Sequence, residues 1–329
     1  MLLKHTKQKI ALGIDIGGTK IMAAVADDGG KILGQSRVPT PSAKKPEPVM
    51  EAVYRAAEKA ATEAGASLTE VSAAGIAVAG VSNPALGIIH TSPNLTGFTE
   101  FAISRAFEEK LGIPPYLIND ANAGAVGEHV WGAGRGAQNL IFITLSTGIG
   151  GGIIIDGALY TGATGAAGEI GHMVLEADGP PCPCGNRGCW EQLASGTALA
   201  CMARERIKAG ALSNIIDMAG GNLENITAEA VGRAAATGDS LAGELMASVS
   251  RYLGVGLANL LNLFNPEIIV IGGGLSKIGK PLLEPAYAEA GKRAFTEPFR
   301  AVKFAGAEMG DDFGVLGAAA HALENYNRK

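Results

Sequence analysis

Short apolar runs alternate with glycine-rich turns along much of the chain. Four such runs predict buried β-strands at Ile10–Ile16, Ile21–Ala26, Leu140–Ser146 and Ile153–Ile155. The first two runs are joined by Gly17-Gly18-Thr19-Lys20, and the last two by Thr147–Gly152. The chain is therefore expected to contain one unit twice: a strand, a glycine turn that carries threonine, and a return strand.

Apolar residues at helical spacing predict helices between further strands. The predicted helices are Val49–Gly65, Phe101–Leu111, Ala121–Gly132, Ala198–Ala209, Leu241–Phe264 and Gly314–Asn325, with a helix pair within Ser213–Asp239. The other predicted strands are Lys31–Pro39, Val71–Val81, a short strand from Ile88, Tyr116–Ile118, Glu267–Ile271 and Val302–Ala305. Strands that alternate with helices indicate an α/β protein.

Composition narrows the class of protein. The 329 residues are enough for two domains, and 47% hydrophobic residues with 47 glycines fit a folded chain with many tight turns. A net charge of −5 gives no electrostatic footprint for nucleic acid. Asp15 interrupts the first apolar run, which favours a strand over a signal peptide, and the uncharged stretch Gly136–Ile155 is too rich in Gly, Ser and Thr for a membrane span. We expect a cytoplasmic protein with neither nucleic acid nor membrane as a partner.

A cluster of metal-binding residue types lies between Glu169 and Glu191. Three of the four cysteines fall within eight residues, and a histidine precedes them; the candidate ligands are His172, Cys182, Cys184 and Cys189. Three thiolates and one imidazole fill a tetrahedral shell, which is typical of structural zinc. The alternative is a disulfide with a spare thiol, but C-x-C neighbours pair badly and no secretory signal is evident. The flanking carboxylates suggest that zinc shapes a binding loop.

Three glycine turns each follow an apolar strand. They are Gly17–Lys20, Thr147–Gly152 and Gly272–Gly274. Backbone N–H groups in such turns bind phosphates, although a single D-x-G-G is an ordinary turn in many proteins. The chain lacks the P-loop sequence, and the third turn lacks the spacing of the dinucleotide fingerprint. Repetition of the turn favours a nucleotide held by two halves of a duplicated fold.

The order of these motifs resembles the ROK family of sugar kinases. The motifs are D-I-G-G-T-K (Asp15–Lys20), N-D-A-N-A (Asn119–Ala123), T-L-S-T-G-I-G-G-G (Thr144–Gly152), G-E-I-G-H (Gly168–His172), C-P-C-G-N-R-G-C-W-E (Cys182–Glu191) and I-G-G-G (Ile271–Gly274). The resemblance implies a two-domain actin-like, ribonuclease-H-like α/β fold with ATP and sugar in the interdomain cleft. The small domain would comprise residues 1–119 and 315–329 with the first phosphate loop. The large domain, residues 120–314, would carry the second phosphate loop, the zinc loop and the adenosine loop.

The resemblance also implies a catalytic base and a set of sugar ligands. Asp120 matches the general base that takes the proton of the attacking sugar hydroxyl, although on the residues alone it also fits a helix N-cap. His172 would serve twice, with one ring nitrogen on zinc and the other facing the sugar, rather than as a core histidine. The implied sugar ligands are Asn119, Asp120, Glu169, His172, Glu191, Gly80 and Asn94.

The nucleotide contacts follow from the same resemblance. They are Asp15, Gly17, Gly18, Thr19, Lys20, Thr147, Gly148, Gly150, Gly272, Gly273 and Gly274, with Asp15 near Mg²⁺. Two places depart from the family pattern. Ser146 stands where glycine is usual, and residues 80–84 (G-V-S-N-P) replace the commoner G-x-P-G at the edge of the sugar site.

The implied reaction is ATP-dependent phosphorylation of the 6-hydroxyl of glucose, a step of carbohydrate metabolism and glycolysis. An N-acetylmannosamine or N-acetylglucosamine kinase is the alternative enzyme, because the same metal loop recurs among those relatives. A sugar-sensing repressor of the family would carry a helix-turn-helix before the first strand, where this chain has about nine residues. A chaperone-like or cytoskeletal ATPase would have no reason to keep the metal loop. The family further implies a homo-oligomer, a dimer or a tetramer.

Overall fold

The computed structural model describes residues 9–92 and 94–328, so residues 1–8, with which a signal peptide would begin, lie outside the described part. The described residues divide into two compact units. The first unit draws on Met1–Gln138, Gly152–Gly168 and Ala307–Lys329, and the second on Asn139–Gly151 and Glu169–Gly306. Within the described ranges, no helix has both the length and the apolar character that a membrane crossing requires.

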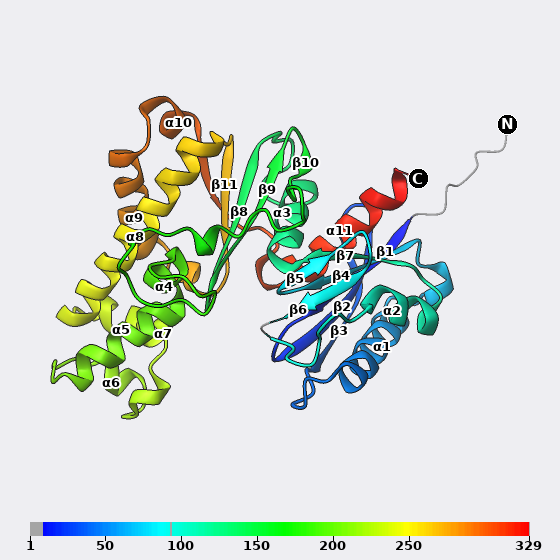
Figure 1. Ribbon diagram of the computed structural model, residues 1–329, viewed down its shortest axis with the longest axis horizontal. Coiled ribbons are helices and arrows are strands. Elements are labelled where there is room, and N and C mark those ends of the chain that lie inside the picture. Colours follow the sequence, from blue (N-terminus) through cyan, green and yellow to red (C-terminus); the bar gives the residue numbers. More distant parts are fainter. Residues whose placement is uncertain (1–8, 93, 329) are drawn as a thin grey trace. The chain divides into compact units, whose positions relative to one another are not determined.

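The first unit is built on a five-stranded sheet (Figure 1). Its order is β3 (Ile32–Pro39), β2 (Lys20–Asp27), β1 (Ile10–Ile16), β4 (Ala73–Val78) and β7 (Pro115–Asn119). Strand β1 runs antiparallel to β2 and parallel to β4, which is parallel to β7. A separate two-stranded sheet pairs β5 (Val81–Asn83) with β6 (Ile88–Thr91). The predicted first hairpin is confirmed.

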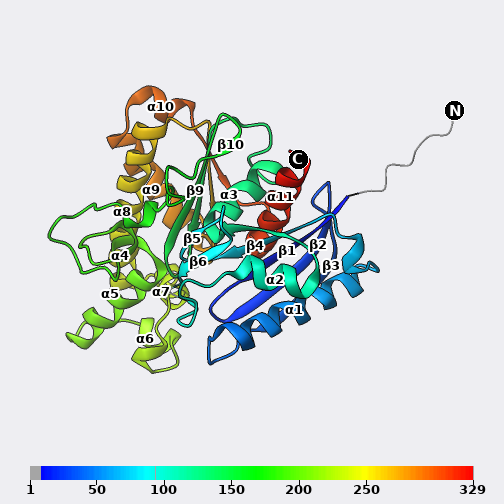
Figure 2. The same cartoon turned by 45° about the vertical axis from the view of Figure 1, so that its right-hand side comes forward.

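Alternation along β1 gives the first sheet two different faces. Leu12, Ile14 and Ile16 enter one core with helices α1 (Pro46–Glu63) and α2 (Ile103–Leu111). On the other face, α11 (Phe313–Asn327) lies directly on the strands, as Figure 2 shows. A β-carbon added to Gly13 would lie 1.9 Å from the carbonyl oxygen of Val315. The glycine is required because the helix backbone occupies the place of a side chain.

The second sheet repeats this plan. Its order is β10 (Ala158–Leu159), β9 (Ile149–Ile155), β8 (Leu140–Leu145), β11 (Ile268–Gly272) and β12 (Lys303–Gly306). Strand β8 is parallel to β11, and β11 to β12, as β1 is to β4 and β4 to β7. The predicted duplication is therefore confirmed in the strand order. The second turn is shorter than predicted, because β9 already begins at Ile149 and includes Gly150.

The second unit contains the predicted helices together with three that were not predicted. Its helices are α4 (Trp190–Ala194), α5 (Gly196–Lys208), α6 (Ile215–Met218), α7 (Ala228–Ala236), α8 (Ser240–Phe264), α9 (Lys280–Arg293) and α10 (Thr296–Ala301), of which α4, α9 and α10 were not predicted. Asp239 caps the long helix α8, which ends at Asn265 in a left-handed conformation. Helix α9 was not predicted, because Pro285 inside its sequence is usually a helix breaker, whereas Pro281 stands in the first turn, where proline is tolerated.

The unit boundary differs from the domain boundary drawn from the family resemblance. Residues 120–138, 152–168 and 307–314 belong to the first unit rather than to the second. The reason is close packing of α3 (Asp120–Val130) against α11, where a β-carbon on Gly317 would lie 1.8 Å from the carbonyl oxygen of Ala123. Helix α3 thus packs on α11, and α11 in turn packs on the sheet that carries Asp15.

Candidate functional site

Predicted site residues of the first unit gather at one edge of its sheet. The register pairs Ile16 with Val78 across β1 and β4, and Val78 with Asn119 across β4 and β7. The turn after β1, Gly80 after β4 and Asp120 after β7 therefore follow three neighbouring parallel strands. Ligands of α/β sheets bind at the carboxyl ends of the strands, so this edge is the candidate site of the first unit.

Two carboxylates, Asp15 and Asp120, lie at this edge, and the charge of Asp120 acts on the pKa of Asp15. Burial, together with the charge of Asp120, raises the pKa of Asp15 from 3.8 to about 7, against the opposing effect of Lys20. Burial also raises the pKa of Asp120, while a hydrogen bond from the backbone of Ala121 lowers it. A carboxylate with a raised pKa is a better proton acceptor, and two close carboxylates favour a bound cation.

The start of α3 shows how Asp120 is oriented. Asn119 is the N-cap, and its side-chain oxygen accepts hydrogen bonds from the N–H groups of Ala121 at 3.0 Å and Asn122 at 3.2 Å. The helix-cap alternative for Asp120 is therefore wrong, because Asp120 is the first helical residue. Its Oδ1 accepts from the Ala121 N–H at 3.0 Å. Since the Asn119 oxygen is engaged, the amide NH₂ is the group that Asn119 can offer to a ligand.

The first glycine turn is closed by short-range hydrogen bonds. The Gly17 N–H donates to the Lys20 carbonyl at 3.0 Å, and the Thr40 hydroxyl donates to the Gly17 carbonyl at 2.7 Å. Asn94 lies against the turn, since a β-carbon on Gly18 would lie 3.2 Å from that of Asn94. The structure thus brings Asn94, predicted on the sugar side, next to the predicted phosphate turn.

Gly314 is a site residue that the sequence analysis missed. A β-carbon there would lie 2.9 Å from Asp15 Oδ2, so the first turn of α11 faces the carboxylate directly. The N-terminus of a helix carries a partial positive charge, which partly offsets the cost of burying this anion. A glycine just inside the first turn of a predicted helix, where propensity disfavours it, was the available signal.

The second unit places its two predicted glycine turns side by side. Parallel strands β8 and β11 pair Thr144 with Gly272, so the segments after them leave the same edge of the sheet. A β-carbon on Gly273, whose φ is +93°, would lie 2.5 Å from the carbonyl oxygen of Leu145. Ser146 fits between the turns, with its hydroxyl 3.6 Å from a β-carbon position on Gly274. Gly150 lies in β9 rather than in the turn.

The other predicted residues of the second unit lie on the segments that surround the second turn. Glu169 precedes the 3₁₀ turn Ile170–His172, and its carbonyl accepts from the His172 N–H at 3.0 Å. Glu191 belongs to α4, and its Oε2 accepts from the Ile149 N–H at 2.9 Å. This contact was not predicted, because 42 residues separate the two partners.

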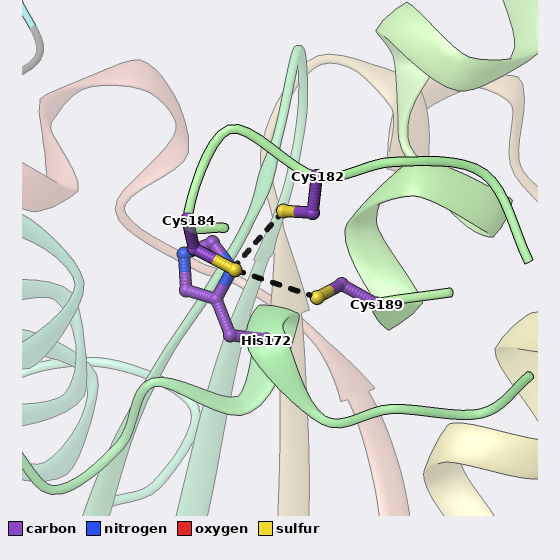
Figure 3. Close-up of side chains that lie close together, drawn as sticks. All are labelled: His172, Cys182, Cys184 and Cys189. Carbon is purple, nitrogen blue, oxygen red and sulfur yellow. Dashed lines mark hydrogen bonds between the residues drawn. The ribbon is translucent and has the colours of Figure 1, made fainter. Parts of the chain in front are cut away.

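His172, Cys182, Cys184 and Cys189 converge as predicted (Figure 3). Their ligand atoms lie within 4.8 Å of one another. The sulfurs of Cys184 and Cys189 are 3.7 Å apart, and the Cys182 sulfur is 3.6 Å from His172 Nδ1. Tetrahedral zinc would hold two sulfurs about 3.8 Å apart, and a sulfur and a nitrogen about 3.6 Å apart. These two distances match tetrahedral coordination, so the cluster is compatible with a zinc site.

The surroundings shift the pKa of two of the thiols. Burial and the neighbouring sulfurs of Cys182 and Cys184 raise the pKa of Cys189 to about 12, so this group becomes a thiolate at neutral pH only where a cation compensates its charge. The pKa of Cys184 is lowered, first by a backbone hydrogen bond from Asn186. All four cysteines of the chain are unbridged, which argues against the disulfide alternative.

Comparisons with known proteins agree with these features. The chain is 37% identical over 318 residues to a glucokinase of Streptomyces coelicolor, an alignment that covers 96% of this chain and 98% of that protein. It is 30% identical over 329 residues to the xylose repressor of Bacillus subtilis, covering 99% of this chain and 80% of the repressor.

A solved structure and a family model both match most of the chain. The ROK family glucokinase from Streptomyces griseus, in complex with glucose and AMPPNP, matches with a TM-score of 0.83 and 36% identity, over 96% of this chain and 99% of that one. The model described as the ROK family matches residues 11–325. With its α/β fold, its mixed sheets and its Cys₃His cluster, the chain belongs to the ROK family.

Proposed function

We propose that the protein is a glucokinase that transfers the γ-phosphoryl group of Mg-ATP to the 6-hydroxyl of glucose. The observation that carries the proposal is the pair Asp15 and Asp120 at the carboxyl edge of the first sheet, beside a glycine turn. Similarity to glucokinases over nearly the whole chain supports it. The two units would correspond to the two domains of an actin-like kinase.

Asp120 is the proposed general base. It starts α3, it is partly buried, and burial raises its pKa, which suits a group that accepts a proton from a sugar hydroxyl. Phosphoryl transfer depends mainly on positioning and on charge stabilisation. Asp15 and the turn Gly17–Lys20 would hold one side of Mg-ATP, and bound Mg²⁺ would neutralise phosphate charge.

Amide, imidazole and carboxylate groups are the proposed sugar ligands. Each can donate to or accept from neighbouring hydroxyls of a hexose. In this proposal Asn119 contributes its NH₂ group, because its oxygen caps α3. His172 contributes Nε2, because its Nδ1 faces the cysteine sulfurs. The remaining proposed ligands are Glu169, Glu191, Gly80 and Asn94.

The Cys₃His cluster is proposed to bind structural zinc. Four protein ligands complete a tetrahedral shell, so no coordination position remains for water or substrate. Zinc would neutralise the three thiolates and fix the segment between Gly171 and Glu191, which supplies two of the proposed sugar ligands, His172 and Glu191.

A panel of sugars tests the proposal. Mg-ATP consumption is measured with glucose, mannose, fructose, N-acetylglucosamine and N-acetylmannosamine, with Asp120→Asn beside the wild type. Turnover with glucose that the variant loses supports the glucokinase. Turnover only with an acetamido sugar would move the enzyme to amino-sugar metabolism, because a pocket with room at C2 distinguishes those kinases.

A sugar sensor is the second candidate, because similarity to a xylose repressor also spans nearly the whole chain. A sensor would bind a sugar without consuming ATP. Sugar titration by calorimetry, run beside the turnover assay, separates the two functions: binding without turnover would contradict the kinase.

A further inference from the structure

The second phosphate turn is held by residues far from it in the sequence. The Gly196 N–H donates to the Ser146 carbonyl at 2.8 Å, and the Thr197 N–H donates to the Thr147 carbonyl at 3.2 Å. Both donors lie at the junction of α4 and α5. Within the turn itself, the Ser146 N–H donates to the Gly148 carbonyl at 2.9 Å. The shape of the turn therefore depends on where α5 begins, and a single residue separates its start from the end of α4.

The side chain of Glu191 accepts a hydrogen bond from the backbone where this turn ends. Its Oε2 accepts from the Ile149 N–H at 2.9 Å, which fixes the peptide between Gly148 and Ile149. A hydrogen bond to a charged acceptor is roughly twice as strong as a neutral one. The carboxylate thus holds the turn at the point where it enters β9.

Gly148 leaves the space that the carboxylate of Glu191 occupies. A β-carbon on Gly148 would lie 2.2 Å from Glu191 Oε2, so any other residue would displace one of the two. Gly148 thus makes room for the acceptor that orients the next peptide. The same carboxylate brings a negative charge close to a turn proposed to bind phosphates, so its charge opposes phosphate binding while its oxygen holds the turn.

Both segments that carry metal ligands press against Ile149. On one side a β-carbon on Gly171, next to His172, would lie 2.0 Å from the Ile149 carbonyl oxygen. On the other side Cys189 is the N-cap residue of α4, two positions before Glu191. The Trp190 N–H donates to the Met173 carbonyl at 2.8 Å and ties the two segments together.

We propose that Glu191 is a positioning residue for the nucleotide as well as a sugar ligand. Its hydrogen bond to Ile149 holds the second turn in the shape that binds phosphate, so one carboxylate serves both substrates. The inference rests on the proposed kinase function. The metal-binding segment would then also help to shape the second turn, because Cys189 is the N-cap of α4, the helix that carries Glu191.

Nucleotide binding without sugar tests the inference. Mg-ADP is titrated by calorimetry into the wild type, Glu191→Ala and Glu191→Gln. Alanine removes the acceptor and is expected to weaken binding about tenfold. Glutamine keeps an acceptor oxygen and removes the charge, so it is expected to bind Mg-ADP at least as tightly as the wild type. Gln192→Ala, a half-buried neighbour on α4, is the matched control and should change nothing.

The decisive quantity is the difference in Mg-ADP affinity between Glu191→Ala and Glu191→Gln. Equal Mg-ADP affinity in the two variants would overturn the role, because a sugar ligand alone gives no reason for them to differ. A wild type that fails to bind Mg-ADP would instead overturn the proposed function.

Gly148→Ala covers the case in which Glu191→Ala folds poorly, and the double variant tests whether both changes act on the same hydrogen bond. Gly148→Ala displaces the same carboxylate while leaving Glu191 in the chain. Gly148→Ala and the double variant Gly148→Ala/Glu191→Ala are expected to show the same loss of Mg-ADP affinity, because both lose one hydrogen bond. A double variant markedly weaker than Gly148→Ala would contradict the inference.

Discussion

The two phosphate turns occupy the same place in two sheets of the same order, but they are held differently. The first, after β1, is closed by its own Lys20 carbonyl and by the Thr40 hydroxyl, and it lies beside the carboxylates Asp15 and Asp120. The second, after β8, is held by Glu191 and by the start of α5. Duplication thus preserved the backbone plan while the chemistry around it diverged.

The difference separates two tasks. The first turn lies next to the groups that can accept a proton and attract a cation, and its shape is locally encoded. The second turn contains backbone donors whose position depends on a segment with four metal ligands. Substitutions near the first turn should therefore affect proton transfer and cation binding. Substitutions near the second turn should affect the position of its backbone N–H donors.

The largest effect is expected for Asp120→Asn. Loss of the proposed base should lower kcat by about 10²–10⁴-fold, because an amide cannot accept the hydroxyl proton. Glucose affinity, measured by calorimetry, should change little, since the amide keeps the shape of the side chain. Retained rapid turnover would refute the assignment of the base.

Cys184→Ser should disturb the second phosphate turn and leave the first phosphate turn unchanged. Losing one of four ligands should remove zinc and destabilise the protein by about 4 kcal/mol. Metal analysis and thermal unfolding measure these effects. Hydrogen exchange should rise in residues 144–150 and 170–192 but not in 15–20. Cys201→Ser, which removes the cysteine outside the cluster, is the control, and a zinc-free wild type would contradict the prediction.

Asp15→Asn should raise stability and abolish activity. The pKa of Asp15 is raised to about 7 in the folded state, so its contribution to stability is complete below about pH 4 and lost as pH rises through about 7. At pH 8 the variant should be more stable than the wild type by about 2 kcal/mol, allowing for partial exposure, with little difference at pH 4.

Thermal unfolding of Asp15→Asn and wild type at the two pH values measures this effect. The exposed Asp178→Asn is the control, and its stability should match that of the wild type. A variant less stable than the wild type at pH 8 would show that Asp15 stabilises the fold as an anion.

The smallest effect is expected for Thr40→Val, which removes one local bond from the first turn. Losing the hydroxyl that donates to Gly17 should weaken Mg-ADP binding about fivefold, corresponding to about 1 kcal/mol. Thr62→Val removes a similar bond within α1 and should leave nucleotide affinity unchanged. Equal effects of the two variants would mean that the bond to Gly17 has no special role in the turn.

The sequence was sufficient where a signal is local. Apolar runs that end in glycine turns predicted both hairpins, and four residues with zinc-ligand chemistry predicted a cluster that forms as expected. Contacts between distant residues left no local pattern, so Gly314 beside Asp15 and Glu191 beside Ile149 were missed. Helix α9 was missed because tertiary packing against α8 overrides the propensity of Pro285.

The C-terminal helix α11 makes the first sheet dependent on the order of synthesis. Gly13 and Gly75 receive the backbone of α11 directly, at Val315 and Ala318. A ribosome that adds about 5–20 residues each second reaches Val315 roughly 15–60 s after Gly13. During that interval one face of the sheet lacks its cover, and the nascent chain presents the very strands that will carry Asp15. The first unit is therefore completed only at the end of synthesis. The edge of the sheet that carries Asp15 and Asp120 reaches its final form only when α11 has docked.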